Sequence, residues 1–474
     1  MNISQRLNRL PASPLLIKVV IIAGLGLMFD AMDQGIVAGV MASITEEWAL
    51  TDLQRSLLGS SGILGMLLGA LVAGIAADRW GRRTIVLVTL LIFSCGSLLC
   101  GLSPGYEWLL VFRFITGIGL GGELPVITTY VSEFSSLKNR GRNVVFVESF
   151  WAWGWILAAL VALIFIPAFS WRAAFFVGAL PAFFAAALRF LIPESPRYLE
   201  QRGRLAEAEA IVSKMERSVG VEPPVNGALP STDVSAFGAS TAEAGSQVNE
   251  TSSQKSEQSS SPPQKLSPFE CFVKLWSREY RQSTIVLWVL WFGINLGYYG
   301  FVLWTPSFLM AQGFEMVRSF EFTLYMSLAQ LPGYLAAALL IEKIGRKRVL
   351  THFLLGTACA AWLFGHASSE PFVLFSGCLL YFFALGAWGC VYSYTPELYP
   401  TTIRTTGAGA ASAFGRVGAF IAPMLVPFMY GQFGSEHGFQ LVFVLLTAVF
   451  VVVAVVIGIF GKETKGRVIP EIGQ

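Results

Sequence analysis

Six ionisable side chains that could do chemistry stand inside long apolar stretches of this sequence. They are Asp30, Asp33, Arg113, Glu123, Glu148 and Arg416. A charged group at the centre of a membrane helix costs at least about 2.5–3.5 kcal/mol on insertion scales, so each needs a physical reason to be there. Two reasons are possible: a static ion pair that holds helices together, or a group that binds or carries charge.

The two aspartates, Asp30 and Asp33, are three residues apart and therefore face nearly the same way on a helix. Burial favours the protonated form of a carboxyl group, whereas a neighbouring cation favours the charged form. A carboxyl that alternates between these environments takes up and releases a proton. The alternative is a permanent buried ion pair.

Arg416 lies within an apolar run, where its guanidinium keeps its charge and must face an anion. The planar fork of donors suits a carboxylate held by two parallel hydrogen bonds. A substrate carboxylate would serve, and so would an internal acid such as Glu123 or Glu148. The chemistry indicated by these side chains is thus proton transfer together with the binding of a small anion.

The elements that position these residues are long apolar segments. Of the 474 residues 54% are hydrophobic and only 13% charged, about half the charge of a soluble domain. Apolar runs long enough to span a bilayer fall at 15–41, 56–77, 84–102, 107–130, 144–167, 172–192, 283–310, 321–342, 348–366, 371–395, 404–430 and 438–460. The sequence predicts an all-α membrane protein with twelve transmembrane helices in two sets of six.

Composition also excludes several classes of function. The 33 basic and 30 acidic residues give a net charge of +3, which does not favour a nucleic-acid partner. The six cysteines lack the short paired spacings of a metal site, and no nucleophile with an adjacent base is visible. We expect no metal, no cofactor and no enzymatic activity.

The order of the segments predicts three regions. Residues 1–192 form an N-terminal six-helix bundle, 193–282 a linker and 283–474 a C-terminal bundle with its tail. Residues 218–267 of the linker are rich in Ser and Pro, which is typical of disorder. Lys and Arg concentrate in the loops on the side of the termini, which predicts that both termini are cytoplasmic.

The two halves repeat each other in sequence. The segment Asp78–Arg83 matches Glu342–Lys347, and Glu133–Arg140 matches Glu397–Arg404, both at an offset of 264. Duplicated helix bundles are typical of secondary transporters, whose substrate site lies between the halves. At the helix ends we expect a gating set that pairs when the halves close: Asp78, Arg79, Arg82, Glu342 and Lys343.

The same loop residues carry a resemblance to a known family. The segments Gly74–Arg83, Arg113–Gly121, Pro193–Arg197 and Glu463–Gly466 resemble signatures of the major facilitator superfamily and its sugar porters. The resemblance covers nearly the whole chain apart from the linker. It implies a twelve-helix transporter in which Asp33 is the proton-coupling aspartate and Arg113 its partner.

A narrower resemblance is to the bacterial niacin permeases, relatives of the organic-ion transporters and the synaptic-vesicle glycoprotein. It rests on Phe29–Asp33, Gly121–Val126, Glu148–Trp155, Gly386–Gly389, Tyr394–Glu397 and Phe414–Arg416. It implies proton-coupled uptake of nicotinate, or of nicotinamide or a related aromatic carboxylate, by an inner-membrane protein that we expect to be a monomer among membrane lipids.

The resemblance and the chemistry together give a set of candidate site residues. For proton coupling these are Asp33, Arg113, Asp30 and Glu123. For substrate binding they are Arg416, Glu148, Trp151, Asn295, Tyr298, Trp388 and Tyr392, of which the aromatic residues are candidates for stacking on a substrate ring.

Three alternatives remain open. A benzoate-type acid would satisfy the same arginine. A sugar is disfavoured because Val289 and Leu290 stand where sugar porters carry paired glutamines. A transporter-like nutrient sensor would need an ordered output domain, for which the linker composition gives no support.

Overall fold

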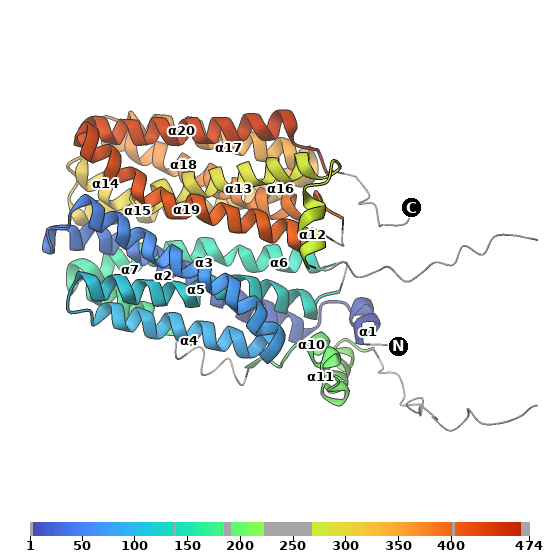
Figure 1. The fold of residues 1–474 in the computed structure, drawn as a ribbon. Coiled ribbons are helices and arrows are strands. Elements are labelled where there is room, and N and C mark those ends of the chain that lie inside the picture. The colour runs from blue at the N-terminus through green and yellow to red at the C-terminus, as the bar shows by residue number, and fades with distance from the viewer. Residues whose placement is uncertain are drawn as a thin grey trace, which may run out of the picture.

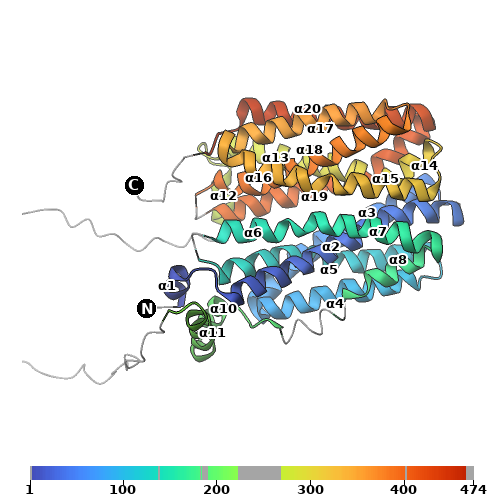
Figure 2. The same cartoon turned by 180° about the vertical axis from the view of Figure 1, so that it is seen from behind.

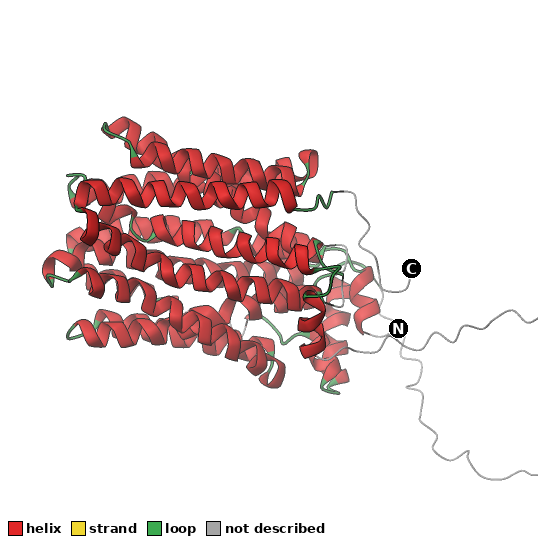
Figure 3. Cartoon of the chain, turned by 45° about the horizontal axis from the view of Figure 1, so that its top comes forward, coloured by secondary structure: helices red, strands yellow, loops and turns green. Residues whose placement is uncertain are grey.

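The computed structural model describes residues 3–136, 139–181, 183, 191–221, 268–400 and 403–465. All regular secondary structure in these residues is helical (Figure 3). Eleven of the helices are long and apolar enough to cross a membrane. The sixth predicted span, 172–192, is described only at its start and its last two residues. The linker is described only up to Val221 and from Pro268 onward.

The helices of the first half form one bundle. They are α1 (Ile3–Arg9), α2 (Pro14–Glu47), α3 (Asp52–Trp80), α4 (Arg82–Gly101), α5 (Tyr106–Phe134), α6 (Arg140–Glu148), α7 (Phe150–Ala168) and α8 (Trp171–Gly178), followed by the short helices α10 (Pro196–Gln201) and α11 (Leu205–Ser218).

The second half forms a second bundle. Its helices are α12 (Pro268–Leu275), α13 (Arg281–Val302), α14 (Thr305–Ala311), α15 (Met316–Leu328), α16 (Gln330–Ile344), α17 (Arg346–Gly365), α18 (Glu370–Glu397), α19 (Arg404–Phe433) and α20 (Ser435–Phe460).

The two bundles lie side by side with their long helices running between two ends of the molecule (Figure 1). The short helices α1, α10, α11 and α12 gather at one end, as the reverse view also shows (Figure 2). We call this the terminal end, because the described chain starts and stops there. This architecture confirms the predicted helical fold with two pseudo-repeats.

Local chemistry explains where the helices begin. Pro14 opens α2 in the first turn, and the hydroxyl of Ser13 accepts a hydrogen bond from the Leu16 amide. Thr51 and Gln54 form a capping box at the start of α3. Such caps satisfy amide groups that have no partner within the helix.

The sequence repeat is also a structural repeat. Arg82 pairs with Asp78 at 2.8 Å and with Glu133 at 3.1 Å. In the second half Arg346 pairs with Glu342 at 2.8 Å and Glu397 at 3.2 Å. Each arginine thus ties the loop between two helices to a third helix of its own bundle.

The pairing of the predicted gating set when the halves close stays a prediction. Its ion pairs form within each half, not between the halves. The guanidinium of Arg79 lies 5.8 Å from the ring centroid of Trp80. The described residues provide no ion pair for Arg79 or Lys343. The sequence analysis missed Arg346, although the repeat places it opposite Arg82.

The two bundles contact each other mainly away from the terminal end. The Ser60 hydroxyl on α3 donates a 3.0 Å hydrogen bond to the Phe420 carbonyl on α19. Gly59 packs against Pro423 in the same region, and α7 packs against α15. These contacts hold the halves together beyond the middle of the membrane helices.

A small helical layer covers the terminal end of the first bundle. Arg6 on α1 donates to Glu216 on α11 at 2.6 Å, and Arg9 donates to the same carboxylate at 3.0 Å. The Glu216 side chain is completely buried. This ion pair fastens the N-terminal helix to the segment that follows the first bundle.

Candidate functional site

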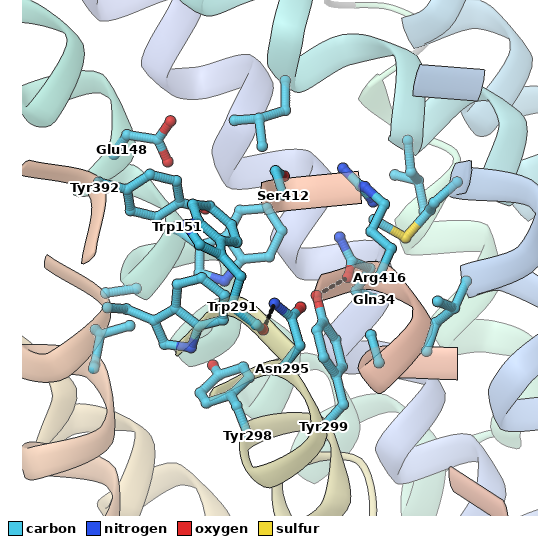
Figure 4. A pocket seen from close by; sticks show the side chains of 18 of the residues that line it. Gln34, Glu148, Trp151, Trp291, Asn295, Tyr298, Tyr299, Tyr392, Ser412 and Arg416 are labelled. Atoms are coloured by element: carbon cyan, nitrogen blue, oxygen red, sulfur yellow. Dashed lines mark hydrogen bonds between the residues drawn. The ribbon is translucent and has the colours of Figure 1, made fainter. Parts of the chain in front are cut away.

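A cavity lies between the two bundles and is lined by helices of both (Figure 4). It holds about 860 Å³ of empty space, counting the part open to solvent. Its polar and aromatic lining comprises Gln34, Glu148, Trp151, Trp291, Asn295, Tyr298, Tyr299, Tyr334, Trp388, Tyr392, Ser412 and Arg416.

An arginine and a glutamate face this cavity from different bundles. Arg416 lies mid-helix on α19 and is half-buried, and Glu148 ends α6 and is only 5% exposed. They lie on opposite sides of the pocket (Figure 4). The described part of the chain offers neither side chain a hydrogen bond or an ion pair. The permanent Arg416–Glu148 and Arg416–Glu123 pairs considered from the sequence do not form in this structure.

Aromatic rings build the wall between these two groups. Trp388 and Tyr392, one turn apart on α18, stack with ring centroids 5.7 Å apart. Trp291 on α13 meets both edge-on, and its indole nitrogen is fixed by a 3.0 Å hydrogen bond to the Thr395 hydroxyl. Tyr298 packs edge-on against Trp388. These mutual contacts hold the rings in place before any ligand enters.

Amide side chains provide further polar groups at the wall. The Asn295 amide nitrogen donates to the Trp291 carbonyl at 2.7 Å, so the amide orientation is fixed. The Tyr299 hydroxyl donates to the side-chain amide oxygen of Gln34, Oε1, at 3.2 Å. The second bond joins α13 to α2 and therefore links the two bundles.

Behind the cavity, Asp33 and Arg113 form a buried ion pair within the first bundle. The N–O distance is 2.7 Å, and the side chains are 0% and 5% exposed. The other Asp33 carboxylate oxygen has no partner in the described residues. Asp33 directly precedes the cavity residue Gln34, so a shift of this part of α2 affects the ion pair and the cavity together.

A second pair of ionisable groups consists of two acids. Asp30 on α2 and Glu123 on α5 are 1% and 0% exposed, and their carboxyl groups lie within hydrogen-bonding reach of each other. Neither Asp30 nor Glu123 forms an ion pair with any described residue. Two adjacent buried carboxyls cannot both carry a charge without a large cost, so this arrangement favours a shared proton.

The structure brings together all seven predicted substrate-binding residues. Arg416, Glu148, Trp151, Asn295, Tyr298, Trp388 and Tyr392 line the one cavity. The four predicted coupling residues lie outside its lining. Their placement agrees with the sequence analysis, and their roles stay predictions.

The sequence analysis missed several lining residues, among them Gln34, Trp291 and Tyr299. A signal for the last two was present, because residues 291, 295, 298 and 299 recur at helical spacing on one face. Gln34 was hidden by its position beside Asp33, since adjacent helical residues point in different directions.

Comparison with known proteins identifies the family. The family model for sugar (and other) transporters matches residues 20–474. The chain belongs to this family.

Curated relatives match over nearly full length. The niacin transporter NiaP of Acinetobacter baylyi is 42% identical over 473 residues, covering 100% of both chains. The putative niacin/nicotinamide transporter NiaP of Bacillus subtilis is 40% identical and covers 94% of this chain and 96% of its own. The organic cation/carnitine transporter 7 of Arabidopsis thaliana is 31% identical over 95% of this chain and 92% of its own.

Solved structures share the fold. The xylose transporter XylE from E. coli, in a partially occluded inward-open conformation, superposes with a TM-score of 0.70 at 19% identity. The match covers 96% of this chain and 100% of that one. The chain is therefore a multi-pass membrane transporter with the major facilitator fold.

Proposed function

We propose that this transporter carries nicotinate, or a closely related small aromatic carboxylate, into the cell together with protons. The observation that carries the proposal is Arg416, which forms no ion pair with any described residue and faces a cavity walled by aromatic rings. The names of the two bacterial relatives above point to the same substrate.

The cavity chemistry suits a flat aromatic acid. The Arg416 fork binds the carboxylate in two parallel hydrogen bonds. The ring then lies among Trp151, Trp388 and Tyr392, where aromatic contact adds about 0.5–1.5 kcal/mol beyond area burial. Asn295 and Gln34 provide further polar contacts at the wall. The seven substrate-binding residues predicted from sequence act together in this proposal.

For proton coupling, the Asp33–Arg113 pair supports the proposal. Protonation of Asp33 removes its negative charge and weakens the ion pair, which frees α2 to move against α5. Asp30, which lies on α2 like Asp33, shares a proton with Glu123 on α5 as a second buried pair. Because Gln34 follows Asp33 directly, proton uptake and substrate contact share one helical turn.

Transport proceeds by alternating access between the two bundles. The excess of Lys and Arg in the loops at the terminal end supports termini and a linker in the cytoplasm of a protein of the bacterial inner membrane. In this orientation the α3–α19 contacts close the periplasmic end in the present structure. The bundles at 1–192 and 283–474 move against each other, with the shift of α2 as an adjustment inside the first, and one chain forms one transport unit.

Competing substrates can be ranked from the cavity. A benzoate-type acid satisfies Arg416 and the rings equally well, so it stays the main alternative. A sugar is disfavoured because neither Val289 nor Leu290 provides the amide group that sugar porters carry there. The structure places Val289 at an apolar outer groove and Leu290 outside the cavity lining. A sensor function has no support in the described residues.

The direct test is uptake of radiolabelled nicotinate into proteoliposomes that contain the purified chain. We expect concentrative uptake with an inward proton gradient, equilibration without one, and competition by unlabelled nicotinate but not by xylose. Uptake that does not depend on the proton gradient would contradict the proposed proton coupling. Absence of any nicotinate binding or uptake by folded protein would remove the substrate proposal.

A further inference from the structure

The Glu148 carboxyl is a buried acid that faces the cavity, and no residue that the structure describes offers it an ion pair. We propose that it donates a hydrogen bond to the ring nitrogen of the bound substrate, so that Glu148 and Arg416 together select a pyridine carboxylate over a benzoate. This inference rests on the proposed function and adds the group that recognises the ring nitrogen of the substrate.

The first support is position. Glu148 ends α6 in the first bundle, whereas Arg416 lies on α19 in the second, and the two face each other from opposite sides of the pocket (Figure 4). Tyr392 lies near enough to both to interact electrostatically with each. A flat ligand along this aromatic wall therefore presents one edge to Arg416 and another to Glu148. Nicotinate carries its carboxylate and its ring nitrogen on different edges.

The second support is the protonation state that the surroundings favour. Glu148 is 5% exposed, and no described residue pairs with its charge. The ionisable groups beside it are the phenols of Tyr334 and Tyr392, and the cation Arg416 stands across the cavity. A buried carboxylate without a paired cation is costly, so the protonated acid is favoured here. A protonated carboxyl donates one hydrogen bond, and the lone pair of a pyridine nitrogen accepts one.

The third support is selectivity. Benzoate has nearly the same shape as nicotinate but presents a C–H group where nicotinate has its nitrogen. A bound benzoate would leave the buried Glu148 O–H without an acceptor. An unpaired buried polar group typically costs enough to change affinity about 10- to 100-fold. A site that lacks this donor would distinguish the two acids only weakly.

The test measures nicotinate and benzoate affinities of the purified full-length carrier by competition binding. We expect the wild type to prefer nicotinate about 10- to 100-fold. Glu148→Leu should weaken nicotinate by a similar factor, leave benzoate unchanged or stronger, and abolish the preference. Glu148→Gln keeps an N–H donor and should retain much of the preference. Arg318→Lys, at an exposed ion pair on the opposite loop side, is the control for a general loss of binding.

A spectroscopic readout covers the case in which Glu148→Leu does not fold. The bound resonance of nicotinate labelled with ¹⁵N in the ring should move toward the hydrogen-bonded position in wild type, and less so in Glu148→Gln. An unshifted ring nitrogen in wild type overturns the inference.

The outcomes separate the two proposals. Equal wild-type affinity for both acids, or a Glu148→Leu carrier that still prefers nicotinate, overturns this inference and leaves the transport proposal standing. A folded wild type that binds neither acid overturns the proposed function, and the inference falls with it.

Discussion

Gln34 and Tyr299 are joined across the interface between the two bundles, because the Tyr299 hydroxyl donates a 3.2 Å hydrogen bond to the side-chain amide oxygen of Gln34. Both residues are buried and both line the cavity. Gln34 also follows Asp33 in the chain. The bond therefore connects the substrate wall of the second bundle to the helical turn that holds the proton-coupling candidate.

Loss of this bond should shift the balance between conformations. Tyr299→Phe removes the donor and leaves the Gln34 oxygen buried without it, so we expect a change of about 1 kcal/mol, or about fivefold, away from the present state. Double electron–electron resonance between spin labels at the exposed positions Lys214 and Arg348 would measure the populations of the present conformation and the alternative one. Tyr325→Phe, which removes an exposed bond to Glu321 within one bundle, should leave them unchanged.

Neutralising Asp33 should separate exchange from accumulation. Asp33→Asn cannot alternate between a charged and a protonated form, so we expect at least a tenfold loss of gradient-driven accumulation with substrate exchange retained. Counterflow and gradient-driven uptake in the same proteoliposomes measure the two activities. Glu207→Gln removes an exposed ion pair with Arg204 and serves as the control. Concentrative uptake by Asp33→Asn would assign the coupling to other groups.

Replacing the fork at position 416 should weaken substrate binding. Arg416→Lys keeps the positive charge but loses the second parallel hydrogen bond, so we expect nicotinate affinity to fall about 10- to 100-fold. Direct binding to purified carrier measures this, with thermal stability checked in parallel. An unchanged affinity would mean that Arg416 has a structural role.

The sequence was sufficient for the architecture because its signals are local and strong. Apolar length located the spans, and the 264-residue offset predicted the repeat that Arg82 and Arg346 display in space. The division of the spans was harder to predict. The run at 283–310 is two helices, α13 and α14. Pro306 in the first turn of α14 has no N–H to bond the Val302 carbonyl four residues earlier, a signal that apolar length alone does not register.

The site was predictable in its members but not in its pairings. Arg416 and Glu148 stood out because charge inside apolar runs is costly. That they face each other without an ion pair depends on how two bundles dock, and no local pattern encodes this. The Asp30–Glu123 contact likewise joins α2 to α5 across 93 positions of the chain. Neutral lining residues such as Gln34 carry no comparable signal.

The ion pair between α1 and α11 should make the docking of the N-terminal helix sensitive to acid. Burial acts to raise the pKa of Glu216, but hydrogen bonds from Arg6 and Arg9 outweigh it and hold the pKa below the ordinary 4.5. A carboxyl with a lowered folded-state pKa stabilises the fold above pH 4.5, and this contribution is lost as the pH falls through the lowered value.

Hydrogen exchange of the α1 amides, corrected for the intrinsic effect of pH, would measure this docking. Glu216→Gln should destabilise it by about 3 kcal/mol at pH 7 and remove its loss under acid. Glu207→Gln breaks an exposed ion pair with Arg204 on the same helix and should have little effect. Equal effects of the two variants would show that the buried pair does not fasten α1.

Close packing of α3 against α5 should make one glycine indispensable and leave another replaceable. A Cβ atom built on Gly117 would clash with the Gly62 carbonyl oxygen, whereas a Cβ on Gly74 would meet nothing within 4 Å. The first contact is with backbone, so the two helices must separate to relieve it. We expect Gly117→Ala to destabilise the carrier by about 1–3 kcal/mol. Gly74→Ala should be neutral or slightly stabilising, because alanine favours a helix over glycine by about 1 kcal/mol.

Thermal unfolding of the two variants in the same detergent gives the comparison directly. Separation of α3 from α5 also displaces Arg113, since its guanidinium packs on Gly62, the residue that an alanine at 117 would push away. Gly117→Ala should therefore lose gradient-driven accumulation along with stability, whereas Gly74→Ala should keep both. A Gly117→Ala carrier with wild-type stability would mean that the two helices are more loosely packed than this structure shows, and the Asp33–Arg113 geometry would lose its main support.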